Sequence, residues 1–444
     1  MRWITDTLKK ATNDAGTNTV FGWFHCVLGI VYLVAFVPLF WEIKALIGQG
    51  GLQPAANLIN KAYSNQGYIA SFLRFPSLYH LYPNDTTLYL IVALGCIAAI
   101  SLVFNYHTFI AAVIAWFCFL SVTSIGGDFF IIIIDLFLAE VGFLSIFSAY
   151  SIQYKNYIPN IIWWVFKWLN FKLWFSMGVI KFYNPHETWT SFTFFDTFFQ
   201  AQPMPTPIAK IFHQTPQSLK SIAIVFIFIG ELLVPFFVFG KKYLRWLSVL
   251  TFVMISVLIQ LNGNYGYFNV LSIVLALTIF KDADLGIGTN TKEPIQKFNA
   301  VRIPLFLHLI LQGIYVLLLF HPKPFSFQNH FNFIHTYIKS DNALTYPIRL
   351  ISYWRLCSPY GVFKSIPNYH GEIRISGSID GSKWESYEFK YLPSGYTNYL
   401  GFYAPYYPRL DHLMFYETLS ERNAKYNTLN PYYKEEIPWS CKFI

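Results

Sequence analysis

The chain has 444 residues, of which 55% are hydrophobic and 12% are charged. Soluble domains carry about 25% charged residues, so this composition excludes an ordinary water-soluble protein. The net charge is +9, but the basic residues are scattered and form no run of five, which argues against nucleic-acid binding. The aromatic content of 20% suits the headgroup regions of a bilayer, so we expect an integral membrane protein in contact with lipids.

Long apolar segments follow one another through residues 1–324. A helix needs about 20 apolar residues to cross a bilayer. By this criterion we expect an α-helical multi-pass membrane bundle of about nine spans. The predicted spans are 20–41, 87–104, 108–124, 129–149, 161–182, 221–239, 244–262, 264–280 and 301–321.

The distribution of lysines predicts the orientation of this bundle. Lys10, Lys155, Lys241 and Lys281 all fall in connections on one side, whereas the short turn at 125–128 has no basic residue. The positive-inside rule then places the N-terminus in the cytoplasm. With an odd number of spans, the C-terminal tail lies outside: in the lumen for a protein of the eukaryotic ER membrane, or in the periplasm for one of the bacterial inner membrane.

The character of the chain changes after the last predicted span. Pro322 and Pro324 end the helix, and no later segment is apolar enough to span. Within 372–390, apolar and polar residues alternate on both sides of Asp380-Gly381, which is typical of a β-hairpin. We therefore predict a mostly β extramembrane domain over residues 325–444.

Two cysteines of this tail, Cys357 and Cys441, are candidates for a disulfide if the tail faces an oxidising compartment. No CxxC pair is present, which argues against a zinc site or a thioredoxin-like activity. We expect neither a metal nor another cofactor.

Four ionisable residues inside or at the ends of spans are functional candidates, because charges in hydrocarbon are costly. Asp135 and Glu140 lie in the fourth span and Glu231 in the sixth. The two carboxylates of the fourth span either tie helices together or take part in function. Lys181, at the outer end of the fifth span, is an interface anchor, a counter-ion for one of the three carboxylates, or a desolvated catalytic base.

The segment 261–269 interrupts two apolar runs with Asn262, Asn264 and Asn269. Asparagine and glycine favour turns and left-handed backbone. The three amides either bind a polar group near the membrane boundary or cap helix ends in a tight turn.

The outer loop 183–220 contains three alternating prolines, Pro203, Pro205 and Pro207. Such spacing favours a stiff, extended backbone. The aromatic run before these prolines suits packing on the bilayer surface or contact with a partner.

Several segments of the chain resemble the lipase maturation factor family. They include GGDFFIIIIDLFLAEVGFL (126–144), KLWFSMGVIKFYNPHETW (172–189), QPMPTP (202–207), LNGNYGYFNVLSIVL (261–275) and, in the tail, APYYPRLDHLMFY (404–416). Eukaryotic members of that family are ER membrane proteins needed for folding and assembly of secreted lipases. The resemblance therefore implies a maturation factor for an exported client such as a lipase.

On this interpretation the client is held by the prolines of the outer loop and by Trp384, Arg409 and Asp411 of the tail. The chain departs from the family at Ile134, where a tryptophan is common, and it lacks a histidine upstream of QPMPTP. These departures leave the client's identity open.

A second, shorter resemblance covers GVIKF (178–182) followed by Trp189. It is similar to the Gly-x-x-Lys-Leu…Trp element of vitamin K-dependent glutamyl carboxylases, in which the matching lysine is the catalytic base. The leading hypothesis is a non-enzymatic chaperone. The alternative is a membrane enzyme that uses Lys181 as a base on a lipid-soluble or peptide substrate.

Overall fold

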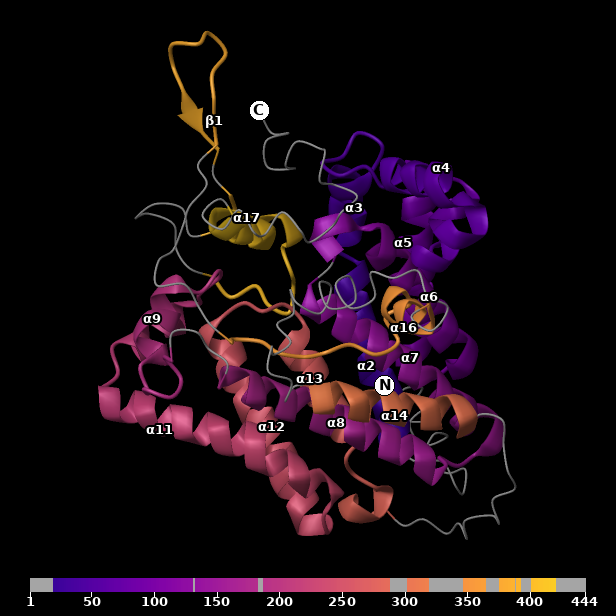
Figure 1. Cartoon of the computed structure of the whole chain (residues 1–444), viewed down its shortest axis with the longest axis vertical. Helices are drawn as coiled ribbons and strands as arrows, with labels where there is room; N and C mark the ends of the chain where they lie inside the picture. The colour runs from indigo at the N-terminus through magenta and orange to yellow at the C-terminus, as the bar shows by residue number, and fades with distance from the viewer. Residues whose placement is uncertain are drawn as a thin grey trace, which may run out of the picture.

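A computed structural model describes residues 19–130, 132–182, 187–287, 302–318, 346–364, 375–387, 389–392 and 401–420. These residues are mainly helical (Figure 1). The longer helices are α2 (Thr19–Phe36), α3 (Leu39–Ile47), α4 (Ala55–Arg74), α5 (Asp85–Val103), α6 (Thr108–Ile125), α7 (Ile133–Lys155), α8 (Asn160–Lys181), α9 (Phe194–Ala201), α11 (Gln217–Phe228), α12 (Lys242–Asn262), α13 (Phe268–Leu277), α14 (Arg302–Leu318), α16 (Tyr346–Tyr353) and α17 (Arg409–Ser420). Shorter helical turns are η1 (Leu78–Leu81), η2 (Gly127–Phe130), α10 (Pro207–His213), η3 (Ile229–Leu233), η4 (Val234–Phe239) and η5 (Asp282–Leu285).

Within the described residues, six helices are long and apolar enough to cross a membrane: α2, α5, α6, α7, the continuous helix 217–239, and α12. This confirms the prediction of a helical multi-pass membrane bundle. The other three predicted spans are also helical, but α13 and the apolar part of α14 are shorter, and α8 carries three lysines. The number of nine spans therefore stays a prediction.

The outer surfaces of these helices are apolar, as a lipid environment requires. On α5, Leu90, Leu94 and Ile97 are all exposed and follow one another at helical spacing. Soluble proteins rarely expose contiguous apolar bands of this kind. Inside the bundle, helices approach closely at glycine: a Cβ on Gly142 of α7 would lie 1.9 Å from the Tyr32 hydroxyl of α2.

The helix over residues 217–239 changes its hydrogen-bonding pattern at Glu231. α11 continues into η3, a π-helical turn, and then into η4, a 3-10 turn. Pro235 has no N–H to donate, so a regular α-helix cannot continue through it. Single π turns often occur at functional sites, and this turn carries Glu231.

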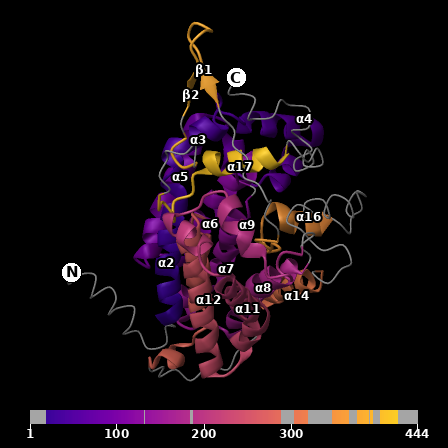
Figure 2. The ribbon, with the colours of Figure 1, turned by 90° about the vertical axis from the view of Figure 1, so that its left-hand side faces the viewer.

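The two ends of the bundle differ. At one end, the backbone N–H groups of Thr19 and Val20 donate to the Asp282 carboxylate at 2.8 and 3.0 Å, which fixes the start of α2 beside η5. At the opposite end lie α3, α4 and α17, and the hairpin of the tail projects beyond them (Figure 2).

The hairpin predicted around Asp380-Gly381 is present. β1 (Ser376–Gly377) pairs antiparallel with β2 (Glu385–Ser386), and Gly381 has a positive φ of 71°. The Asp380 carboxylate accepts from the N–H of Ser382 and of Lys383, both at 2.9 Å, which closes the turn. The described tail otherwise contains α16 and α17, so these residues do not confirm a mostly β domain.

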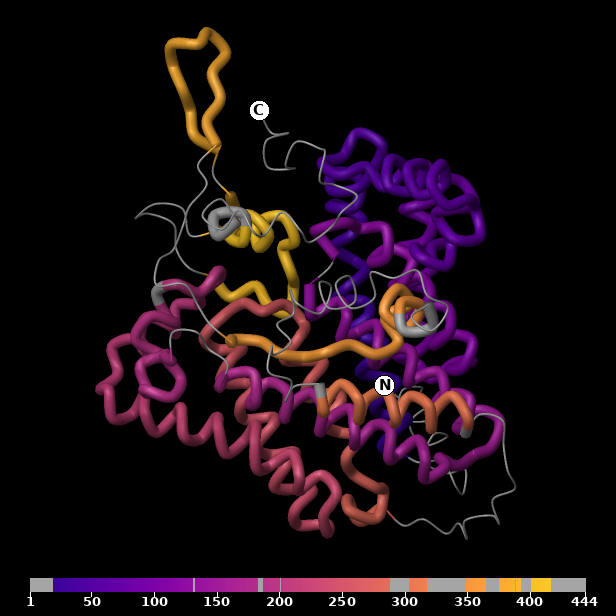
Figure 3. Tube along the Cα trace, in the orientation of Figure 1, coloured from indigo at the N-terminus to yellow at the C-terminus, as the bar shows by residue number. Residues whose placement is uncertain are grey.

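Residues 355–364, which we call the crossing segment, run in an extended path from α16 toward α9 (Figure 3). Along this path Gly361 packs against Ile180 of α8, and the indole N–H of Trp189 donates to the Phe363 carbonyl at 2.8 Å. The tail is therefore packed against the helical bundle at several points.

Candidate functional site

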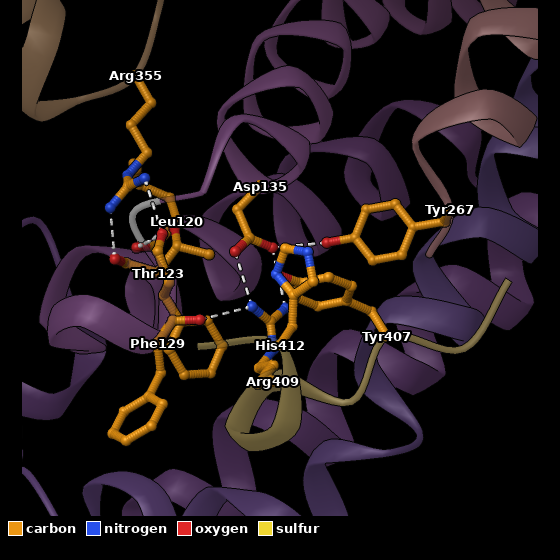
Figure 4. Close-up of polar contacts among 10 residues, drawn as sticks. Leu120, Thr123, Phe129, Asp135, Tyr267, Arg355, Tyr407, Arg409 and His412 are labelled. Carbon is orange, nitrogen blue, oxygen red and sulfur yellow. Dashed lines mark hydrogen bonds and ion pairs between the residues drawn. The ribbon is translucent and has the colours of Figure 1, made fainter. Parts of the chain in front are cut away.

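Asp135 forms a buried ion pair with Arg409 of the tail. Asp135 lies in the first turn of α7 and has no exposed surface. The Arg409 guanidinium donates from Nη1 to Oδ2 at 2.7 Å and from Nη2 to Oδ1 at 2.9 Å, and the Tyr267 hydroxyl donates to Oδ1 at 2.6 Å (Figure 4). This two-point geometry is the strong form of an arginine–carboxylate contact.

Arg409 keeps its charge in a buried setting. Burial works against the charged form, but the Asp135 carboxylate more than offsets it and raises the pKa of the guanidinium. The guanidinium lies 3.9 Å from the centre of the Phe130 ring, which adds a cation–π contact. Next to it, burial lowers the pKa of His412 to about 3, so its neutral ring can accept a hydrogen bond from the Tyr407 hydroxyl.

A second arginine of the tail, Arg355, also inserts into the bundle. It donates to the Thr123 carbonyl in the last turn of α6 and to the Phe130 carbonyl at 3.2 Å (Figure 4). Helix C-termini carry unsatisfied carbonyls and partial negative charge, which favour a cation. Burial lowers the pKa of Arg355 to about 10, which leaves it cationic at neutral pH.

Glu140 lies in the centre of the second buried cluster. Lys172 Nζ of α8 donates to its Oε1 at 2.6 Å. Its other oxygen, Oε2, accepts from the Ser358 N–H at 2.9 Å and from the Tyr360 hydroxyl at 2.6 Å. The crossing segment thus supplies two of the hydrogen-bond donors to this carboxylate among the described residues.

The same cluster brings together three groups that are metal ligands in other proteins. Ligand atoms of Glu140, His308 and Cys357 lie within 4.8 Å of one another. However, Lys172 Nζ also lies 3.4 Å from Cys357 Sγ, so a cation already occupies this place. Burial raises the pKa of the Cys357 thiol, which disfavours the thiolate that a metal requires. This donor set fits the lysine better than a divalent ion.

Lys181 contacts Glu231, one of the three carboxylates that the sequence analysis considers as its counter-ion. The two charged groups form a short ion pair, and Lys181 Nζ also donates to the Met177 carbonyl at 3.0 Å. Both side chains are buried, and the ammonium lies 4.9 Å from the centre of the Trp189 ring. The role of Lys181 as a base stays a prediction.

The three candidate asparagines act in different places. The Asn264 side chain bonds to the tail: its Oδ1 accepts from the N–H of Tyr403 and of Ala404, both at 3.1 Å, and its Nδ2 donates to the Gly401 carbonyl at 2.9 Å. Asn262 donates to the Leu258 carbonyl and Asn269 to the Gln260 side chain, both within the bundle.

The proline segment is held against the turn that contains these asparagines. Pro205 and Gly263 form an isolated β-bridge, the Thr206 N–H donates to the Asn262 carbonyl at 3.1 Å, and the Asn264 N–H donates to the Met204 carbonyl at 2.9 Å. Pro203 is buried, whereas Pro207 is exposed. Most of this segment therefore has an internal packing role.

The candidate client-binding residues of the tail differ in exposure and in their partners. Trp384 is 64% exposed on the hairpin, as a binding residue should be. Arg409 is 2% exposed and fully engaged by Asp135, which argues against direct contact with a client. Asp411 is half-buried and accepts from the Tyr391 N–H at 3.1 Å. Cys441 lies outside the described residues, so its pairing with Cys357 is not tested.

The sequence interpretation missed Arg355, Ser358 and Tyr360 as partners of the bundle. One signal was available. Lys167 is close enough to the end of its span to reach water. Only Lys172 and Lys181 then remain within the predicted spans as counter-ions for the three carboxylates of Asp135, Glu140 and Glu231. One carboxylate therefore needed a cation from elsewhere in the chain.

Comparison with known proteins gives a consistent family assignment. The profile of the lipase maturation factor transmembrane domain matches residues 20–287, and that of the lipase maturation factor C-terminal domain matches residues 356–433. The second match includes Arg409 and all of the crossing segment except its first residue, Arg355. No solved structure matches the chain.

Individual relatives agree with this assignment. The chain is similar to lipase maturation factor 2 of Xenopus tropicalis, with 24% identity over 93% of this chain and 71% of the relative. It is 27% identical to lipase maturation factor 1 of Mus musculus and 26% identical to that of Homo sapiens, in both cases over 88% of this chain and 72% of the relative. With more than half of its length matched by the transmembrane-domain profile, the chain belongs to the lipase maturation factor family of integral membrane proteins.

Proposed function

We propose that this protein is a membrane-embedded maturation factor that assists the folding or assembly of an exported client, such as a secreted lipase. The observation that carries the proposal is the Asp135–Arg409 pair, which joins the tail to the membrane bundle. A tail that is anchored by buried charges presents a fixed surface to a client instead of an independently moving domain. The names of the relatives support a lipase as the client.

We place residues 1–324 in the membrane with nine spans, and residues 325–444 on the outer side. The bonds from Thr19 and Val20 to Asp282 support this topology, because they put two predicted inner segments at the same end. The hairpin projects from the opposite end (Figure 2). In a eukaryotic cell that side is the ER lumen, and in a bacterium it is the periplasm.

The hairpin offers the apolar surface that an incompletely folded client would contact. Ile379 is fully exposed, and Trp384 and Tyr387 are 64% and 65% exposed. Large apolar side chains exposed along one hairpin are typical of interaction sites. Because unfolded chains also expose apolar side chains, this contact requires no catalytic group.

Co-expression with a secreted lipase from the same organism tests the proposal. The double substitution Ile379→Ser and Trp384→Ser should lower the specific activity of the secreted lipase, while the yield and melting temperature of the factor stay unchanged. Ile69→Ser is the control, since Ile69 is also an exposed apolar residue at the same end of the molecule but lies on α4. Unchanged lipase activity in the hairpin variant would contradict client binding at this site.

A second variant separates the chaperone from the enzyme hypothesis. Replacing both members of the inner pair, Lys181→Met with Glu231→Gln, removes two buried charges together and leaves neither unpaired. A chaperone with this pair substituted should retain its effect on the lipase as long as it remains folded. Loss of maturation by a folded variant would instead favour a base-dependent reaction.

A further inference from the structure

A cavity of about 210 Å³ lies between α9, α11 and α12, beside the Lys181–Glu231 pair. Its walls are mainly apolar, and phenylalanine is the commonest residue in them, with Phe194, Phe198 and Phe226 among the examples. For comparison, an engineered apolar cavity of about 150 Å³ admits benzene. This cavity is therefore large enough for a ligand with more carbon atoms than one aromatic ring.

The cavity borders the bilayer. Leu219 of α11 and Leu258 of α12 both line it, and both are also exposed on the outer surface of their helices, at 54% and 37%. Helices α11 and α12 belong to two of the six segments long enough to span. A ligand dissolved in the membrane can therefore reach the cavity from the side.

Three charged side chains line this mainly apolar cavity: Lys220 is paired with Asp196 at 3.3 Å, and Lys181 and Glu231 are paired with each other. Lys181 and Glu231 both line the cavity, and they are 1% and 2% exposed. An ammonium has three N–H donors, and two of those of Lys181 are taken by Glu231 and the Met177 carbonyl. Among the described residues, Lys181 is also the hydrogen-bond donor recorded for Glu231, although a carboxylate can accept about four bonds. The pair thus has capacity both to donate and to accept.

The charge balance of the pair restricts the ligand. Lys181 and Glu231 cancel each other and Lys220 is paired with Asp196, so a ligand that brings a further charge would leave that charge without a counter-ion of its own, at considerable cost. A hydroxyl group can accept from Lys181 and donate to Glu231 without this cost, and a carbonyl can accept from Lys181.

We propose that this cavity binds a neutral lipid, whose hydrocarbon part packs against the phenylalanines and whose hydroxyl or carbonyl oxygen contacts the Lys181–Glu231 pair. This site lies apart from the hairpin that we propose to contact the client. Its occupant comes from the bilayer, and its selectivity depends on one neutral polar group.

Bromine quenching of tryptophan fluorescence tests this site directly, because Trp189 lines the cavity. Three probes of equal and short chain length, which keep the bromine near Trp189, are added to the purified full-length protein in detergent: 5-bromo-1-pentanol, 1-bromopentane and 5-bromopentanoate. The signal of Trp189 is the difference between the wild type and Trp189→Phe. We expect saturable quenching by the alcohol, with about tenfold tighter binding than the alkane, as two hydrogen bonds to charged groups allow.

Substitutions then separate the polar and apolar parts of the site. In Lys181→Met with Glu231→Gln, the alcohol should lose its roughly tenfold advantage over the alkane, while the alkane still quenches. Ala223→Phe fills the cavity from α11 and should abolish saturable quenching by both. Ala93→Phe on α5, away from the cavity, is the matched control and should bind as the wild type does.

Three results would overturn the proposal. Equal affinity of the wild type for alcohol and alkane would remove the role of the ion pair. Tightest binding by the carboxylate would show an anion site instead. Saturable quenching that survives Ala223→Phe would place the probe elsewhere on the protein.

Discussion

Asp135 in the first turn of α7 and Arg409 in the first turn of α17 are 274 residues apart in sequence, yet they form a two-point ion pair with no more than 2% of either side chain exposed. The first belongs to the membrane bundle and the second to the tail. A pair so deeply buried stabilises the docked tail only while both partners are present, because removal of one leaves an unpaired charge in a low-dielectric setting.

We expect Arg409→Met to detach α17 by stranding the Asp135 carboxylate. The docked state should lose about 3–5 kcal/mol, the usual cost of breaking a buried pair. Limited proteolysis of the purified protein should then cleave the tail near residues 401–408 at a higher rate. Arg409→Met combined with Asp135→Asn should recover much of the resistance, since neither charge remains. Equal cleavage of the single and double variants would contradict this account.

The Glu140 cluster predicts a smaller effect for Tyr360→Phe. The variant keeps the buried ring but removes the hydroxyl that donates to Glu140 at 2.6 Å. Hydrogen bonds to charged groups contribute about 1.5–3 kcal/mol, so the melting temperature should fall by several degrees at most. Tyr391→Phe is a suitable control, because it removes a tail hydroxyl at a half-buried position away from Glu140. An equal fall in both variants would remove the special role of the Glu140 contact.

The three asparagines of 261–269 allow a matched comparison. Asn264→Ala removes the acceptor for the N–H groups of Tyr403 and Ala404, so these amides should exchange hydrogen faster by mass spectrometry. Asn262→Ala and Asn269→Ala remove bonds inside the bundle and should leave exchange at residues 401–404 unchanged. Faster exchange at those residues in all three variants would indicate general loosening of the turn.

Docking of α17 should weaken in acid because of His412. Burial lowers its pKa to about 3 from an ordinary value near 6.5, so the ring is neutral when docked and gains a proton when released. The undocked state therefore binds more protons between these two values, and docking loses about 2 kcal/mol from pH 6.5 to pH 5. Hydrogen exchange of residues 409–416 measures this loss. His412→Asn keeps an acceptor for Tyr407 but does not titrate, and it should flatten the dependence over that range.

The membrane bundle could be predicted from sequence because hydrocarbon imposes a local rule: each span needs a long apolar helix, and polar groups within it need partners. Asp135, Glu140 and Glu231 were found in this way. The partners of these three carboxylates could be predicted only in part. Lys181 was named beside Glu231, but the partners of Asp135 and Glu140 include tail residues 274 and 218–220 positions away.

The contacts between the tail and the bundle could not be predicted from the sequence, for a physical reason. Its alternating residues correctly predicted the hairpin, which depends on neighbours in sequence. The crossing segment has little regular structure of its own, and it is positioned by contacts to side chains of α7 and α8 that no local pattern reports. Arg409 looked like a surface residue because arginine is rarely buried without a partner, and its partner lay in another part of the chain.

Phe363 takes part both in the attachment of the tail and in the wall of the cavity. Its carbonyl accepts from Trp189 as part of the crossing segment, and its ring forms part of the wall of the cavity beside Lys181. Any coupling between filling of the cavity and attachment of the tail through this residue would therefore be reciprocal. Through such coupling, the lipid composition of the surrounding membrane would alter how firmly the outer domain is held.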